Sequence, residues 1–112
     1  MKNINMVTKN ETGDRMLHNV GKSTLLYGIR LQQELFKNIK GLPRAGTSKQ
    51  IQVKIKGNYY PASLLHEKPK GKRIMFSIRW VKTSKLALQA AYDIGDVIEL
   101  ETESAGFIIR KG

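Results

Sequence analysis

The densest cluster of reactive side chains in the sequence is a basic segment at His66–Arg73. Its cations are Lys68, Lys70, Lys72 and Arg73. A proline and a glycine stand between them, as is typical of a turn. Cations on such a protrusion can contact several phosphates of a nucleic acid at once. The alternative is a solvated hairpin tip whose lysines only protect a sheet edge from aggregation.

The basic residues of the whole chain are concentrated in the same region. The net charge is +11 over 112 residues. Between residues 35 and 90, thirteen Lys and Arg stand against one acid, Glu67, whereas the remaining residues hold seven basic and eight acidic side chains. A positive field confined to one region attracts a polyanion, and nucleic acid is the commonest polyanion in a cell. The competing interpretation is a lysine-rich surface that keeps the protein soluble.

One short pattern suggests nucleotide hydrolysis. Gly21-Lys22-Ser23-Thr24 matches the end of a phosphate-binding loop, in which backbone amides wrap the phosphates and the lysine contacts them. The complete pattern needs a glycine five positions earlier, and Met16 stands there. We therefore do not expect a nucleotide hydrolase.

Paired carboxylates are the other candidates for catalysis. They are Asp93 with Asp96 and Glu99 with Glu101. The second pair is spaced like two outward side chains of a solvent-facing edge strand. Neither pair is followed by the lysine that a metal-dependent nuclease would use. We expect a protein without enzymatic activity.

The composition excludes several further classes. Without cysteine there is no disulfide or thiol chemistry, and His18 and His66 cannot complete a metal site unaided. We expect no metal and no cofactor. The first residues carry no apolar signal core, and no apolar run approaches the ~20 residues that span a bilayer. We expect a cytoplasmic protein with no membrane contact.

Hydropathy patterns predict one domain at residues 21–112, preceded by a flexible arm at residues 1–20. Thr24–Leu31 is predicted as a strand and Gln32–Lys40 as a short helix, with one helix over Ser23–Lys40 as the alternative. Gly41, Pro43 and Gly46 indicate a loop.

Alternating apolar residues predict strands through most of the remaining chain. The expected elements are strands at Ile51–Lys56, Tyr59–Leu65, Arg73–Val81, Val97–Thr102 and Phe107–Lys111, a hairpin turn at Gly57–Asn58, and a helix at Lys85–Tyr92 capped by Thr83 or Ser84. Pro61 suits an edge position or a bulge. The fold class is mainly β, a small open pseudobarrel of about six or seven strands with two short helices.

The element order resembles the B3-type DNA-binding pseudobarrel of plant transcription factors and of restriction-endonuclease target-recognition domains. The likeness covers about residues 24–111 and is carried by Arg73–Trp80, the helix Lys85–Tyr92 and the segment Ile94–Leu100. It implies a grip on the major groove by two arms, one at His66–Arg73 and one at Arg30–Gln33. No nuclease domain accompanies these residues, so the resemblance implies binding without cleavage.

The leading hypothesis is a non-catalytic module that binds double-stranded DNA. Phosphate contacts are assigned to Arg44, Lys49, Lys68, Lys70 and Lys72. Base contacts are assigned to Arg30, Gln32, Gln33 and Arg73, with Arg79 as an additional contact. The alternatives are an RNA-binding small barrel and a basic protein-interaction module that acts as an accessory factor or inhibitor of a nucleic-acid enzyme.

Overall fold

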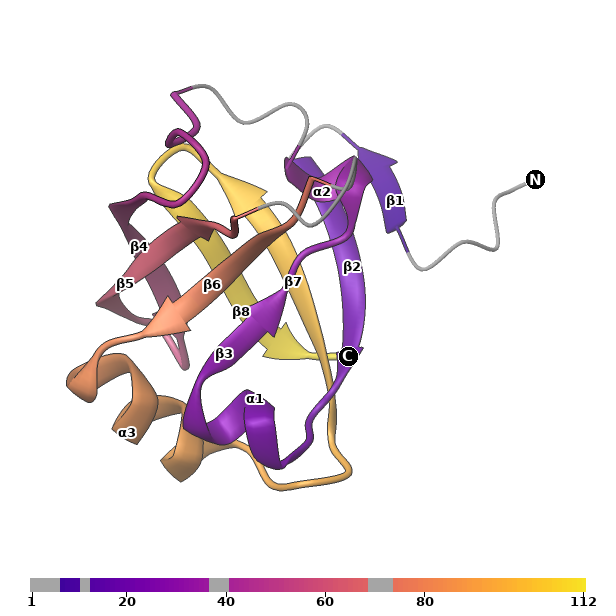
Figure 1. Cartoon of the computed structure of the whole chain (residues 1–112). Coiled ribbons are helices and arrows are strands. Elements are labelled where there is room, and N and C mark those ends of the chain that lie inside the picture. Colours follow the sequence, from indigo (N-terminus) through magenta and orange to yellow (C-terminus); the bar gives the residue numbers. More distant parts are fainter. Residues whose placement is uncertain (1–6, 11–12, 37–40, 69–73) are drawn as a thin grey trace.

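The computed structural model describes residues 7–10, 13–36, 41–68 and 74–112. These residues form eight strands and three helices, and the strands build one sheet that curls into a half barrel (Figure 1). In chain order the elements are β1 (Val7–Asn10), β2 (Gly13–Asn19), α1 (Lys22–Leu26), β3 (Gly28–Arg30), α2 (Gln33–Phe36), β4 (Ser48–Ile55), β5 (Asn58–His66), β6 (Phe76–Trp80), α3 (Lys82–Ala91), β7 (Val97–Glu103) and β8 (Gly106–Lys111). The predicted mainly β, open barrel-like fold is confirmed, with eight strands in place of six or seven and three helices in place of two.

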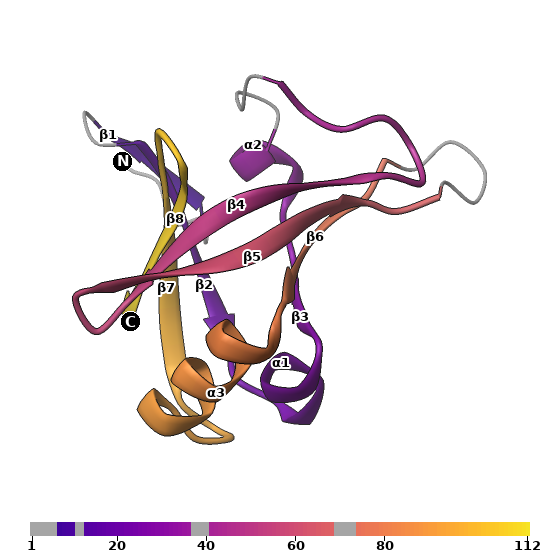
Figure 2. The same cartoon turned by 90° about the vertical axis from the view of Figure 1, so that its left-hand side faces the viewer.

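The strand order across the sheet is β1-β2-β7-β8-β4-β5-β6-β3. Neighbouring strands are antiparallel except β4 and β8, which run parallel. We call β4, β5, β6 and β3 the basic half of the sheet, and β2, β7 and β8 the acidic half. Helices α1 and α3 lie together at one end of the half barrel, and α2 lies at the other end (Figures 1 and 2).

The β4–β5 hairpin follows the predicted alternation. Ile51, Val53 and Ile55 are buried. Ile55 pairs with Asn58, so the two turn residues are Lys56 and Gly57 rather than the predicted Gly57–Asn58. Both have positive φ angles, 51° and 86°, as the tight turns that match the twist of a hairpin require.

Pro61 occupies a position where its missing amide hydrogen costs no hydrogen bond between strands. It pairs with Gln52, whose own N–H donates to Ala105 O of the neighbouring turn at 2.9 Å. Pairing of β5 with β6 begins only at Ala62, opposite Trp80. Pro61 therefore lies where β5 has no partner on one side, as at an edge, although β5 as a whole pairs with β4 and with β6.

Segment 21–36 differs from both predictions. Residues 22–26 form α1, only residues 28–30 form a strand, and α2 spans Gln33–Phe36, while residues 37–40 of the predicted helix lie outside the described residues. A Cβ atom on Gly28 would overlap the Ile78 carbonyl oxygen, so glycine alone lets β3 approach β6 this closely. The single-helix alternative fails for the same reason, because β3 pairs with β6 where that helix would continue.

The prediction of a flexible arm over residues 1–20 was wrong for the residues described there, because residues 7–10 form β1 and pair with β2. Residues 13–19 form β2, which pairs with β7 inside the sheet, and Met16 and Val20 are buried. His18 stands between them on the same face and breaks the apolar alternation, which hid the strand in the sequence. The domain therefore begins before residue 21, and residues 1–6 and 11–12 lie outside the described residues.

Helix α3 begins at Lys82, before the predicted start at Lys85, and neither predicted cap is correct. Val81 precedes the first turn, and its N–H donates to Ser84 Oγ at 2.9 Å. The Ser84 hydroxyl thus satisfies a backbone amide from inside the first turn. Within the described residues, no helix is long and apolar enough to cross a membrane.

The core lies between the inner face of the sheet and the helices. Its largest fully buried side chains are Phe76, Phe107, Ile29, Leu35, Ile55, Leu64, Ile78, Leu88, Ile98 and Leu100. They come from both halves of the sheet and from α2 and α3, so a single core holds the half barrel together. Trp80 is half-buried against this cluster, and its indole N–H donates to Thr24 O at 2.6 Å.

Candidate nucleic-acid interface

The loop at residues 41–47 is bound to the end of β5. Gly46 N donates to His66 O at 2.8 Å, and His66 N donates to Thr47 O at 3.0 Å. The His66 ring adds a hydrogen bond from Nδ1 to Pro43 O at 2.9 Å. This loop and the segment 66–68 therefore lie side by side at the end of the half barrel that carries α2, which we call the basic end (Figure 2).

Two predicted phosphate ligands lie on this loop and beside it. Arg44 is exposed, and its carbonyl oxygen accepts hydrogen bonds from Thr47 N at 2.9 Å and Thr47 Oγ1 at 2.6 Å. Lys49 is exposed at the start of β4, and its Nζ donates to Gly41 O at 3.1 Å. An ammonium group has three donors, so Lys49 can hold the loop and still meet a phosphate.

The predicted basic segment is described only in part. Lys68 is exposed directly after β5, and Glu67 N donates to Met75 O at 2.9 Å where the chain returns to β6. Lys70, Lys72 and Arg73 lie outside the described residues.

Arg30 is held by Glu67, the acid of the basic region. Nε of Arg30 donates to Oε2 of Glu67 at 3.3 Å, and Nη2 donates to Oε1 at 3.2 Å. The Arg30 side chain is 64 % exposed and that of Glu67 16 % exposed. The remaining donors of this guanidinium therefore face solvent while the carboxylate fixes its direction.

Ser77 completes this arrangement from β6. Its hydroxyl donates to Oε2 of Glu67. The hydrogen bond from Ser77 lowers the pKa of Glu67, the pair with Arg30 and the charge of Arg79 lower it further, and partial burial opposes them. Glu67 is therefore ionised at neutral pH and serves as a fixed support for Arg30.

Arg30 and Arg79 share the outer surface of the basic half. Arg30 pairs with Ser77 across β3 and β6, and Gly28 pairs with Arg79, so the two arginines are diagonal neighbours. Long side chains at diagonal positions on neighbouring strands are close enough to contact the same ligand. Both arginines line a depression of about 330 Å³, together with His18, Ser23, Thr24, Tyr27, Gly28, Ile29 and Ser77.

Gln32 and Gln33 follow β3 at the same end of the sheet. Leu31 N donates to Phe76 O at 2.8 Å, which fixes the chain beside the start of β6 just before them. Gln32 is half-buried, whereas Gln33 is exposed at the first position of α2. The structure thus brings Arg30, Gln32 and Gln33 to the edge nearest the basic segment.

A second basic depression was missed in the sequence. It has a volume of about 300 Å³ and is lined by Lys54, Lys56, Gly57, Tyr92, Ile108, Ile109, Arg110 and Lys111. The two β4 lysines lie over aromatic rings: Lys54 Nζ is 5.5 Å from the Tyr59 ring centre and Lys56 Nζ is 5.2 Å from that of Tyr92. The alternation of β4 pointed these lysines outward, but only the parallel β4–β8 pair places them beside Arg110.

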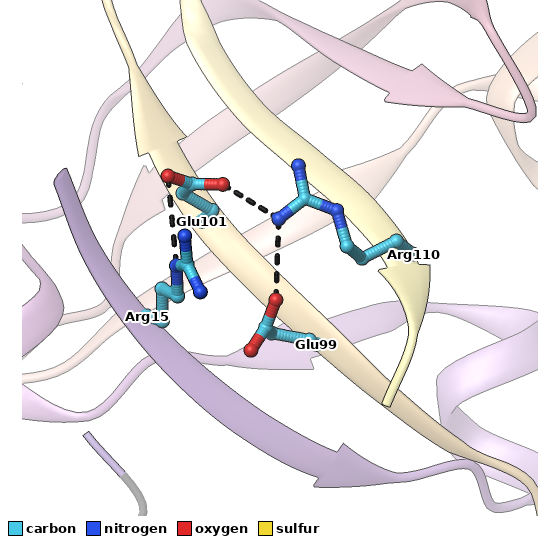
Figure 3. Close-up of polar contacts among 4 residues, drawn as sticks. All are labelled: Arg15, Glu99, Glu101 and Arg110. Carbon is cyan, nitrogen blue, oxygen red and sulfur yellow. Dashed lines mark hydrogen bonds and ion pairs between the residues drawn. The ribbon is translucent and has the colours of Figure 1, made fainter. Parts of the chain in front are cut away.

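The sequence suggested that Glu99 and Glu101 lie on an edge strand. This is wrong, because β7 lies between β2 and β8. Arg110 reaches both carboxylates from β8, with Nη1 at 3.2 Å from Glu99 and 2.6 Å from Glu101 (Figure 3). Arg15 of β2 approaches Glu101 at 3.6 Å (Figure 3). The Glu101 side chain is only 4 % exposed, so these contacts neutralise a buried carboxylate.

The segment Gly21-Lys22-Ser23-Thr24, which matches the end of a phosphate-binding loop, takes part in the packing of the fold. Gly21 precedes α1 and residues 22–24 form its first turn. The Thr24 hydroxyl is buried, accepts a hydrogen bond from Gly21 N at 3.0 Å and lies 2.8 Å from Nε2 of His18. Partial burial lowers the pKa of His18. In the part of the chain that the structure describes, no group of three or more His, Asp or Glu is placed to hold a metal ion.

Comparison with protein-family models, with curated proteins and with solved structures finds no match for this chain. The B3-type resemblance therefore stays a prediction that depends on element order.

Proposed function

We propose that this protein binds double-stranded DNA without cleaving it, through the basic end and the adjoining outer surface of β3 and β6. The observation that carries the proposal is the bonding of the 41–47 loop to His66. It joins basic residues that are distant in the sequence to the start of the basic segment. Cations gathered on one surface can neutralise several phosphates together, which scattered cations cannot do.

The charge balance at this surface supports a polyanionic partner. The cations here are Arg30, Arg44, Lys49, Lys68 and Arg79, and the carboxylate among them is Glu67. Lys70, Lys72 and Arg73 follow in the basic segment. Arg44, Lys49 and the three lysines of the segment would hold phosphates.

The fixed direction of Arg30 supports its assignment to a base contact. A guanidinium that is already oriented loses less side-chain entropy when it binds, and its planar donors match the acceptors on a guanine edge. Gln32 and Gln33 follow it on the chain and carry amides that can pair with adenine. Arg73 would approach from the basic segment. Together these residues would supply the two arms that the B3-type resemblance implies.

Salt dependence tests the proposal directly. Labelled duplex DNA, hairpin RNA and single strands are titrated by fluorescence anisotropy at several salt concentrations. With about five phosphates engaged, log affinity for the duplex should fall with log salt at a slope of roughly −4 to −5. A slope near zero would remove the electrostatic basis, and tighter binding of hairpin RNA would favour the RNA-binding alternative.

Charge-removing variants locate the contact. Lys68, Lys70 and Lys72 changed to Gln should flatten the slope by about 3, since each phosphate contact contributes about 1. The matched control changes Lys82, Lys85 and Lys111 to Gln and removes the same charge from α3 and β8. Equal losses in the two variants would mean that net charge alone drives binding. Salt-resistant binding to a protein partner, with weak binding to every oligonucleotide, would favour a protein-interaction module.

A further inference from the structure

The side chains that line the depression beside Arg30 suit a ligand that carries both an anionic group and an aromatic ring. The depression lies where β2 and α1 come next to β3 and β6. Among the described residues, its lining contains two guanidinium groups, the ring of His18, the phenol of Tyr27 and three further hydroxyl-bearing side chains. No carboxylate is among these lining residues. A volume of about 330 Å³ is near the lower limit of roughly 300–1,000 Å³ for small-molecule sites. Such a space suits one nucleotide better than a duplex.

Two arginines can meet one phosphate here. Arg30 and Arg79 are diagonal neighbours on adjacent strands, and both are exposed. Glu67 takes up one side of the Arg30 guanidinium and leaves its other donors in solvent. His18 adds no charge at neutral pH, because burial lowers its pKa. The positive charge of the depression therefore comes from the arginines.

Tyr27 supplies an aromatic surface at the same place. The residue is 60 % exposed although its backbone is fixed on both sides. Tyr27 N donates to Ser23 O at 2.8 Å, and Tyr27 O accepts a hydrogen bond from Trp80 N at 3.0 Å. A ring that is held by its backbone and left open to solvent is suited to stacking on a base.

Gly28 lies in the lining of the depression between Tyr27 and Arg30 and allows β3 to approach the backbone of β6 closely. Because a Cβ atom would overlap the Ile78 carbonyl oxygen, no other residue fits at this position without displacing β3. The site thus combines two arginines and an exposed aromatic ring within one short segment, residues 27–30, and the facing strand.

We propose that this depression binds one unpaired nucleotide of the nucleic acid, with its base against Tyr27 and its phosphate between Arg30 and Arg79, so that Arg30 contacts this phosphate in place of the base edge that it contacts in a fully paired duplex. The inference rests on the proposed function, because the two arginines belong to the same interface. It adds a preference that duplex binding does not require: an unpaired nucleotide should strengthen the complex.

The test compares one labelled duplex in three forms: blunt, with a single-stranded extension, and with one internal unpaired base. The extension or the unpaired base should raise affinity roughly tenfold over the blunt duplex, as expected for one stacked base. The two forms distinguish a terminal nucleotide from an internal one. In Tyr27→Ala the affinity ratio between unpaired and blunt forms should fall to about one, and in Tyr27→Phe, which keeps the ring, the ratio should persist.

Tyr59→Ala is the matched control. Tyr59 is 52 % exposed, and the neighbouring Glu103 side chain, which belongs to the acidic half, raises the pKa of its hydroxyl. This variant should keep the wild-type ratio. Thermal unfolding confirms that each variant is folded.

The outcomes separate this inference from the proposed function. Binding of the blunt duplex without any gain from an unpaired base overturns the nucleotide site and leaves duplex binding intact. A gain that survives in Tyr27→Ala also overturns it. If no duplex binds, the proposed function fails. A nucleoside 5′-monophosphate that then changes the fluorescence of Trp80, whose indole bonds to Thr24 of the lining, would support the site alone, and no change would overturn it.

Discussion

Two arginine–glutamate clusters lie on the outer surface of the same sheet, and they differ in what they leave exposed. In the acidic half, Glu101 is 4 % exposed and receives Arg110 and Arg15, while Glu99 shares Arg110 (Figure 3). In the basic half, Glu67 fixes Arg30, whose side chain remains 64 % exposed.

The charges balance in the first cluster and not in the second. Two arginines meet two glutamates in the acidic half, so little charge remains for a partner. In the basic half Arg30 and Arg79 face one carboxylate, and further cations lie on the adjoining loops. The same pair of residue types therefore stabilises the sheet in one half and orients an unneutralised cation in the other.

Removing Glu101 should have the largest effect. Glu101→Ala leaves Arg15 and Arg110 beside a cavity and takes away a buried ion pair, so the free energy of unfolding should fall by about 3 kcal/mol. Urea denaturation followed by circular dichroism measures it. If the free energy of unfolding falls no further in Glu101→Ala than in Glu67→Ala, the two clusters do not differ in their contribution to stability.

Exchanging arginines for glutamines should separate stability from binding. Arg30→Gln with Arg79→Gln should lower duplex affinity roughly tenfold or more at low salt and flatten the salt slope by about 1–2, because two nucleic-acid contacts are lost. The free energy of unfolding should change by no more than about 0.5 kcal/mol, since both side chains are exposed.

Arg110→Gln is the counterpart in the acidic half. It should lower the free energy of unfolding by about 1–2 kcal/mol, because two carboxylates lose a shared donor, with affinity close to that of the wild type. The reverse pattern, with Arg110 needed for binding and Arg30 for stability, would contradict the assignment of the two halves.

The smallest effect concerns pH. The pKa of Glu67 is lowered, first by the Ser77 hydroxyl and then by Arg30. Since the folded pKa lies below the unfolded one, ionised Glu67 stabilises the fold at neutral pH, and that contribution disappears as the pH falls through the folded pKa. The stability difference between wild type and Glu67→Gln should be constant at neutral pH and shrink below about pH 4. Urea denaturation of both proteins across this range measures it, and a difference that grows in acid would show the opposite shift.

The sequence predicts the elements whose patterns are regular. Strands with alternating apolar residues, such as Ile51–Lys56 and Phe107–Lys111, were found nearly in place. Strand β2 was missed because His18 occupies an inward position between Met16 and Val20. Helix α1 was taken for a strand because its apolar residues also fit an alternating pattern, and only the approach of Gly28 to Ile78 shows where the strand begins.

The candidate site was predictable as a set of charges but not as an arrangement. Charge counting identified Arg44, Lys49 and Lys68, yet their proximity depends on backbone bonds between His66 and the 41–47 loop that no local pattern encodes. Tyr27 was missed as a surface residue because alternation assigned it to the same face as Ile29, whereas it is exposed at the end of α1. Burial of Glu101 was equally hidden, since its partners come from β2 and β8.

The place of β8 between β4 and β7 has a consequence for the order of folding. Strands β4, β5 and β6 follow one another along the chain and pair as neighbours, so most of the basic half can form from local contacts. Strand β2 cannot pair with β7 until β7 has been synthesised. Strands β4 and β7 each have an unpaired edge until residues 106–111 form β8 between them. We expect the nascent protein to assemble most of the basic half, the proposed DNA-binding surface, before the sheet is continuous, and to be most prone to misassociation through those open edges until β8 is synthesised.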